Sequence, residues 1–249
     1  MMRDVKAVLL VGGLGIRLRS AVPSAPKVLA SVGKRSFLQL LVSQLRSQGI
    51  HRLVMCTGYL AEQIEKEFGN GQASDVAIEY SREEQPLGTA GAVKLARHYL
   101  KDDSEFLVMN GDSFLEIDFH NFMEFHRSHE AMASIAVLRV EDTNRYGTVN
   151  VDADGRVMGF AEKTGREVPG LVNGGVYVFN HAVLQSIPEQ PASPEKDIFP
   201  RLLDQGVYAQ EQHGMFIDIG TPTDYARAQK LCDSLNDAAS RGRISSFPG

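Results

Sequence analysis

The first half of the chain alternates short apolar runs with segments of helical periodicity, and this alternation constrains the fold more than any other feature. The apolar runs cover residues 5–11, 52–58, 76–80 and 106–112. Strands of a parallel sheet carry apolar side chains on both faces, because helices cover both sides of such a sheet. The pattern therefore predicts an α/β fold with a Rossmann-like, doubly wound and mostly parallel mixed sheet.

Helical segments are predicted between these strands. Residues 36–39 have the spacing of a capping box, and leucines and a valine then recur at helical spacing up to Gly49. Further helices are predicted over 60–68 and 89–100.

The second half changes to shorter strands separated by turns. Strands are predicted at 133–140, 146–151, 156–163, 174–180 and 214–220, with a hairpin turn at 152–155 and a helical segment near 196–205. A final helix is predicted from the N-cap Thr221 through Tyr225, Ala228, Leu231 and Leu235. We expect one domain over 1–240 and a mobile tail over 241–249.

Composition excludes several classes of function. The formal net charge of −5 argues against a nucleic-acid-binding protein, although a local positive pocket is enough to bind a nucleotide. Two cysteines do not make a disulfide framework. The apolar run 5–11 is too short for a signal peptide or a membrane span. We therefore expect a cytoplasmic protein that binds neither nucleic acid nor membrane.

Residues 9–20, LLVGGLGIRLRS, are nearly a dinucleotide-binding fingerprint, but Leu18 stands where the third glycine belongs. A Walker loop is excluded, because no Gly-Lys-Ser/Thr follows. What remains is a glycine turn with free backbone N–H groups and two cations, Arg17 and Lys27, which suits a triphosphate. The alternative is a tight structural turn with surface cations.

Two aspartates follow apolar strands, where ligands collect in open α/β sheets. Asp112 ends the motif NGD and Asp218 lies in FIDIG. Such a pair is one way of holding Mg²⁺ beside phosphates, and each residue alone is equally well explained as a turn or strand-end residue. Gly88 and Thr89 begin a helix whose first amides could read the edge of a base.

Together these pieces resemble the sugar-phosphate nucleotidyltransferases. The resemblance covers residues 5 to about 230 and rests on motifs in the family's order: GGLGIRL (12–18), Pro26-Lys27, Gly33-Lys34-Arg35, PLGTAGA (86–92), NGD (110–112), YG (146–147), EK (162–163), NGGVYVF (173–179) and DIGTP (218–222). It implies a three-layer, GT-A-like fold. It also implies a reaction in which a sugar 1-phosphate attacks the α-phosphorus of a nucleoside triphosphate and releases pyrophosphate.

The resemblance assigns roles to individual residues. It implies that Arg17, Lys27 and Asp112 are catalytic and that Mg²⁺ is held by Asp112 and Asp218. The implied nucleotide-binding residues, all within the nucleotide-binding half of about 1–115, are Gly12, Gly13, Gly15, Arg17, Lys27, Gln85, Gly88, Thr89 and Asp112. The implied sugar-phosphate-binding residues, within 116–240, are Gly147, Glu162, Lys163, Asn173 and Gly174.

Two residues depart from the family pattern. Ile16 replaces a threonine or serine and removes a hydroxyl near the phosphates, and Arg35 replaces a proline. Neither change removes a group with an implied catalytic role, so we expect an active enzyme. A binding-only regulator that kept the pocket is the alternative from another functional class.

Among short family members, the chain is most similar to the D-glycero-D-manno-heptose 1-phosphate guanylyltransferases. This likeness favours GTP as the nucleotide and a heptose 1-phosphate as the sugar, giving GDP-heptose for bacterial surface polysaccharide. The alternatives are mannose 1-phosphate with GTP, or a uridylyltransferase acting on N-acetylmuramate 1-phosphate or glucose 1-phosphate. Relatives often form dimers, so the resemblance also suggests a homodimer.

Overall fold

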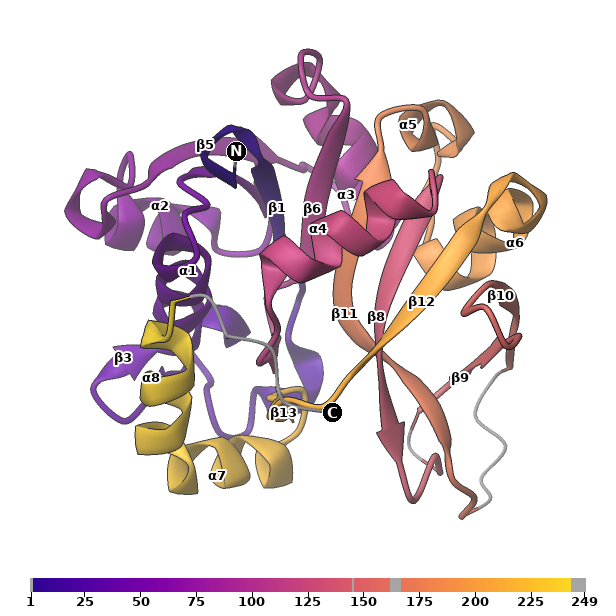
Figure 1. The fold of residues 1–249 in the computed structure, drawn as a ribbon. Coiled ribbons are helices and arrows are strands. Elements are labelled where there is room, and N and C mark those ends of the chain that lie inside the picture. The colour runs from indigo at the N-terminus through magenta and orange to yellow at the C-terminus, as the bar shows by residue number, and fades with distance from the viewer. Residues whose placement is uncertain (1, 145, 162–166, 243–249) are drawn as a thin grey trace.

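A computed structural model gives the fold, and it describes residues 2–144, 146–161 and 167–242. A large mixed sheet lies between two layers of helices (Figure 1). The predicted three-layer α/β architecture is confirmed. In the described part of the chain, none of the helices has the length and apolarity needed to cross a lipid bilayer.

The first half builds the parallel part of the sheet. Its four strands run in the spatial order β5-β4-β1-β6, with bounds β1 Lys6–Leu10, β4 Arg52–Thr57, β5 Ala77–Arg82 and β6 Glu105–Asn110. Three helices connect them: α1 Phe37–Ser47, α2 Ala61–Phe68 and α3 Gly88–Leu95, the last continued by a 3₁₀ turn at Ala96–Tyr99. The predicted capping box is present, because the Ser36 hydroxyl accepts from the Gln39 amide while the Gln39 side chain accepts from the Ser36 amide.

Strand β1 shows why these apolar runs form central strands. Ala7 and Leu9 point into the core beneath α1, α2, α4 (Phe119–Ser128) and α8 (Cys232–Ser240). Val8 points into the opposite core, beneath α3, α5 (Val183–Ser186) and α6 (Phe199–Leu202). Successive side chains of a strand point to opposite faces, so a strand buried on both faces needs an unbroken apolar run.

The second half builds the antiparallel part. Its strands are β8 Ala133–Val140, β9 Thr148–Val151, β10 Val157–Ala161, β11 Gly170–Asn180 and β12 Val207–Gln212. Strand β11 pairs antiparallel with β6 and so attaches this half to the parallel half. On its other side β11 pairs with β8, which in turn pairs parallel with β12. The predicted hairpin turn is confirmed, with Gly155 in the left-handed region (φ 80°).

A bulge bends β11 at two consecutive glycines, Gly174 and Gly175. The register of β11 against β8 shifts between Asn173 and Tyr177. Gly175 has φ 75°, and a Cβ atom at that position would lie 2.8 Å from the side-chain nitrogen Nδ2 of Asn110 and 3.2 Å from its Cβ. Glycine avoids both the backbone strain and the steric conflict, so it permits the bend that turns the start of β11 away from β6.

The C-terminal region differs from the sequence expectations in three ways. Strand β12 was not predicted, because its sequence VYAQEQ ends in three polar residues and gives no long apolar run. The strand expected at 214–220 is only β13 (Phe216–Asp218), which pairs with the short strand β7 (Ser113–Leu115) outside the main sheet. The single final helix is two helices, α7 (Pro222–Lys230) and α8, because the chain turns at Leu231 and α8 packs its apolar side on α1.

Helix α4 packs against β8 through His126. Its side chain is buried and its ring nitrogen Nδ1 forms a hydrogen bond with the hydroxyl of Ser134 at 2.9 Å. Burial lowers the pKa of His126 to about 4. His126 therefore belongs to the packing between α4 and β8.

The bulge can be tested by Gly175→Ala. This change should lower the free energy of unfolding by about 1–3 kcal/mol, since a left-handed alanine and a new steric contact both act against the folded state. The matched control is Gly159→Ala in β10, where an added Cβ meets nothing within 4 Å. Urea denaturation of both variants checks this; equal unfolding free energies would contradict the role of Gly175.

Candidate active site

Several strands of the first half end at one edge of the sheet, and the predicted nucleotide residues gather there. Strand β1 continues into the loop 11–15, and β6 continues into Gly111 and Asp112. The amide of Gly111 donates to the carbonyl of Leu10 at 3.0 Å, which ties the two strand ends together. In α/β sheets this carboxyl edge is where ligands bind.

The glycines of the loop 11–15 make room for neighbouring backbone. A Cβ atom on Gly12 would lie 3.1 Å from the amide nitrogen of Gly58. Gly15 is left-handed (φ 59°), and a Cβ there would lie 3.0 Å from Cβ of Lys27. Gly13 has open space around it and an exposed backbone. The loop can therefore lie close to both the β4 end and Lys27.

Lys27 and Asp112 form an ion pair across this edge. Lys27 arrives on a 3₁₀ turn at Lys27–Leu29, after the proline-interrupted stretch. The Lys27 side chain is 14% exposed and the Asp112 side chain 27% exposed, so both are shielded but reachable. Two residues that the sequence places 85 positions apart thus meet at one point.

Asp218 comes to the same point from β13. The amide of Ile219 donates to the backbone carbonyl of Asp112 at 2.9 Å, and the amide of Gly220 donates to the Asp218 carboxylate. A Cβ on Gly220 would lie 2.7 Å from an Asp218 oxygen and 3.3 Å from a guanidinium nitrogen of Arg17. The strand pair β7–β13 therefore brings Arg17 and both aspartates together, which sequence spacing could not establish.

The two aspartates interact electrostatically. Burial raises the pKa of Asp218 above its ordinary 3.8, and the negative charge of Asp112 raises it further. The hydrogen bond from Gly220 and the charge of Lys27 lower the pKa of Asp218, but these effects are smaller. Added positive charge beside these two carboxylates would therefore lower the pKa of Asp218 and stabilise its ionised form.

A cavity of about 410 Å³ opens beside these groups. Its lining includes Gly12, Gly13, Lys27, Gly88, Thr89 and Asp112 from the predicted nucleotide set. Gln85, also predicted, lines an adjoining cavity of about 610 Å³ that shares Gly12, Leu14, Glu83 and Pro86 with the first. Gly15 and Arg17 do not line either cavity, and Arg17 stands exposed at the side of Asp218.

Two ionisable residues of the cavity wall were not among the predicted site residues. The Glu83 carboxylate accepts from the Leu87 amide at 3.0 Å, and burial raises its pKa. This bond fixes the turn that precedes α3. Cys56 is buried, and burial raises its pKa to about 12, so its thiol is protonated and unreactive.

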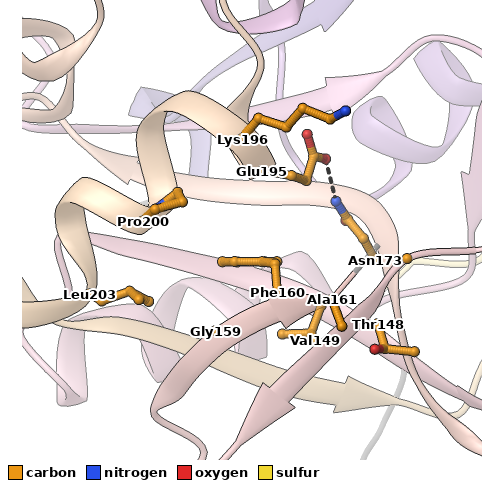
Figure 2. A pocket seen from close by; sticks show the side chains of 11 residues that line it. Thr148, Val149, Gly159, Phe160, Ala161, Asn173, Glu195, Lys196, Pro200 and Leu203 are labelled. Atoms are coloured by element: carbon orange, nitrogen blue, oxygen red, sulfur yellow. Dashed lines mark hydrogen bonds between the residues drawn. The ribbon is translucent and has the colours of Figure 1, made fainter. Parts of the chain in front are cut away.

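A separate cavity in the second half of the chain, of about 610 Å³ and called the second cavity below, lies between β9, β10, β11 and the helical segment after Ser193 (Figure 2). It contains Gly147 and Asn173 from the predicted sugar-phosphate set. Gly174 is buried instead: a Cβ there would lie 2.8 Å from a methyl of Leu115, so this glycine serves packing at the bulge. Glu162 and Lys163 lie outside the described residues.

Glu195 and Lys196 also line the second cavity and were missed in the sequence. They belong to a π-helical turn, Pro194–Ile198, capped by the Ser193 hydroxyl, which accepts from the Lys196 amide. Asn173 donates to the Glu195 carboxylate at 2.7 Å (Figure 2). The pattern Ser-Pro-Glu-Lys was readable as a helix start, but nothing in it indicated a cavity.

A chain of contacts through the β6–β11 pair links the wall of the first cavity to the wall of the second. Asn110 lines the first cavity and its side chain packs against Gly175. The amide of Gly175 donates to the Asn173 side chain at 2.9 Å, and Asn173 lines the second cavity. The acids of the site therefore stand beside a cavity whose wall is linked to that of the second.

Comparison with known proteins identifies the family. The model of the nucleotidyl transferase family matches residues 6–234, and the chain belongs to this family.

Two individual relatives with similar sequences are guanylyltransferases. A D-glycero-alpha-D-manno-heptose 1-phosphate guanylyltransferase of Aneurinibacillus thermoaerophilus is 38% identical over 228 residues, which cover 91% of this chain and 97% of that protein. The mannose-1-phosphate guanylyltransferase catalytic subunit beta of Drosophila pseudoobscura pseudoobscura is 37% identical over 224 residues, covering 88% of this chain. The chain spans only 60% of that relative's length.

A solved structure is similar to this chain in both fold and sequence. The crystal structure of HddC from Yersinia pseudotuberculosis complexed with GMP-PN superposes with a TM-score of 0.80 at 33% identity. The superposition covers 91% of this chain and 98% of that one.

The raised pKa of Asp218 can be tested by measuring the free energy of unfolding at two pH values. A raised carboxyl pKa means that the folded state holds the proton more tightly than the unfolded chain, so ionisation above pH 3.8 costs the folded state stability. Asp218→Asn should therefore raise the free energy of unfolding at pH 7, and this gain should shrink as the pH falls toward 3.8.

Urea denaturation at pH 7 and pH 4 measures this effect. The control is Asp204→Asn, which changes an exposed carboxylate far from Asp112 and should leave stability nearly unchanged at both pH values. A stability loss in Asp218→Asn at pH 7 would show that Asp218 acts as a structural anchor.

Proposed function

We propose that the chain transfers a nucleoside monophosphate from a nucleoside triphosphate to a sugar 1-phosphate, releasing pyrophosphate. The observation that carries this proposal is the meeting of Lys27, Asp112, Asp218 and Arg17 beside the first cavity, whose wall is linked to that of the second through the β6–β11 pair. A transfer between two phosphate-bearing substrates needs two adjoining spaces and a shared cluster of charges. In this proposal, residues 1–115 bind the nucleotide and 116–240 bind the sugar phosphate.

The transfer itself needs no covalent enzyme intermediate. A phosphate oxygen of the sugar 1-phosphate forms a bond to the α-phosphorus, while the bond from that phosphorus to the β-phosphate oxygen breaks and pyrophosphate leaves. Lys27 would hold the two reacting phosphates together, and Arg17 would stabilise charge that develops on the triphosphate. The free N–H groups of Gly13 and its neighbours would bind the outer phosphates.

Asp112 and Asp218 fit a divalent cation, and we assign Mg²⁺ to them. Burial and the negative charge of Asp112 both raise the pKa of Asp218, and a bound cation would offset both effects. Among the described residues, no group of three or more His, Cys, Asp or Glu side chains is placed to hold a metal. Two protein carboxylates with waters and substrate phosphates are the usual arrangement for Mg²⁺, which when bound neutralises phosphate charge.

For the substrates, we propose GTP and D-glycero-α-D-manno-heptose 1-phosphate. Two relatives support this choice: the heptose 1-phosphate guanylyltransferase, aligned over 97% of its length, and HddC, crystallised with GMP-PN. The second candidate is mannose 1-phosphate with GTP, favoured by the relative at 37% identity.

The substrate proposal is tested by measuring pyrophosphate release with each nucleoside triphosphate and a panel of sugar 1-phosphates. We expect turnover with GTP and the heptose 1-phosphate, and less with mannose 1-phosphate. Turnover with UTP but not GTP would overturn the choice of base. Nucleotide binding without turnover in any combination would show a binding-only regulator.

The assigned charges are tested by Lys27→Ala and Asp112→Asn. Each should lower kcat at least ~10²-fold, the scale of lost electrostatic stabilisation at a reacting phosphate. Matched controls are Lys101→Ala and Asp102→Asn, which are exposed just before the opposite end of β6. Near-normal kcat in either site variant would mean that its role is misassigned.

A further inference from the structure

The transfer reaction leaves one carboxylate of the second cavity without a role. The Glu195 side chain lies in this cavity (Figure 2). Its oxygen Oε1 accepts hydrogen bonds from Asn173 Nδ2 at 2.7 Å and from the Tyr177 hydroxyl at 3.2 Å. Its second oxygen, Oε2, has no hydrogen bond or ion pair within the described part of the chain.

The protein fixes the position of this carboxylate. Tyr177 is buried, and its pKa is raised well above 10.0 by that burial and by the charge of Glu195, so its hydroxyl stays protonated and donates. Reciprocal bonds close the turn around Glu195: Asp197 Oδ2 accepts from the Ser193 amide at 2.7 Å, and the Ser193 hydroxyl accepts from the Lys196 amide at 3.3 Å. The carboxylate is therefore held before any ligand arrives.

Glu195 is the carboxylate among the described residues of this cavity wall, and its other polar lining side chains are Asn173, Lys196 and Thr148. The remaining lining residues are glycine or apolar: Gly147, Val149, Gly159, Phe160, Ala161, Pro200 and Leu203. Phe160 stacks on Phe199 with ring centroids 5.3 Å apart, and this contact holds the Phe160 ring in place in the apolar wall. Such a wall suits the C–H surface of a sugar ring, while the ring's hydroxyl donors need an acceptor such as Glu195.

We infer that Glu195 is a specificity-determining residue, whose Oε2 accepts a hydrogen bond from one hydroxyl of the sugar ring. This inference rests on the proposed function. A carboxylate repels the phosphate of the substrate, so the hydroxyl-bearing side of the ring faces Glu195. A sugar that lacks the hydroxyl leaves the held carboxylate unpaired, which is how a polar site rejects a near analogue.

The test is Glu195→Gln, which keeps the shape of the side chain. The amide oxygen can still accept from Asn173 and Tyr177, but the amide NH₂ then replaces the free acceptor. The KM for the sugar 1-phosphate should rise about 10- to 100-fold, as expected for a lost hydrogen bond to a charged group. The KM for the nucleoside triphosphate should not change.

The control is Glu189→Gln, an exposed glutamate that does not line the second cavity. It should leave both KM values unchanged. Thermal unfolding establishes that each variant is folded. If Glu195→Gln does not fold, Glu195→Asp is measured instead, because its shorter carboxylate cannot reach both its donors and the sugar.

Singly deoxygenated sugar 1-phosphates separate recognition from a structural effect. With the wild-type enzyme, one deoxy analogue should lose about 10- to 100-fold in kcat/KM, and with Glu195→Gln the same analogue should match the parent sugar. An unchanged sugar KM in a folded variant, or an equal loss for every analogue in both enzymes, would overturn the inference. Absence of turnover in the wild type with every substrate pair would instead overturn the proposed function.

Discussion

The antiparallel pairing of β11 with β6 is the interaction on which the rest of the site depends. It aligns Val176 with Met109 and Tyr177 with Val108, and thereby attaches the antiparallel half to the parallel half. Strand β6 leads into Asp112, and β11 carries Asn173 at the start of its bulge. A shift of one residue would turn every β11 side chain to the other face, which would bury Asn173 differently and separate the two cavities.

The second constraint is electrostatic. Two carboxylates and two cations converge on a partly shielded edge, and of these four side chains Lys27 and Asp112 form a direct ion pair in the described part of the chain. Asp218 keeps a raised pKa, which means that the folded state carries a charge it would be more stable without. Sites that bind polyphosphates and cations commonly carry such a cost, since interactions reserved for substrates are unsatisfied in their absence.

Much of the site was readable because its residues stand at the ends of recognisable strands. The apolar runs before Gly12 and Asp112 predicted both strands, and parallel strands place their carboxyl ends together. Asp218 and Asp112 had no link in the sequence, because their approach depends on the small β7–β13 pair. Glu195 was missed for the same reason: its helical turn gives no sign of the strands it faces.

The sequence by itself determined the α/β class, the helix capped at Ser36 and the loops that carry Gly12, Lys27 and Asp112, since these follow from local periodicity and capping. Only the tertiary structure decided the break between α7 and α8, the existence of β12 and the position of Glu195. Each of these depends on contacts between segments far apart in the chain: α8 on α1, β12 on β8, and Glu195 on Asn173. Local propensity carries no information about such partners.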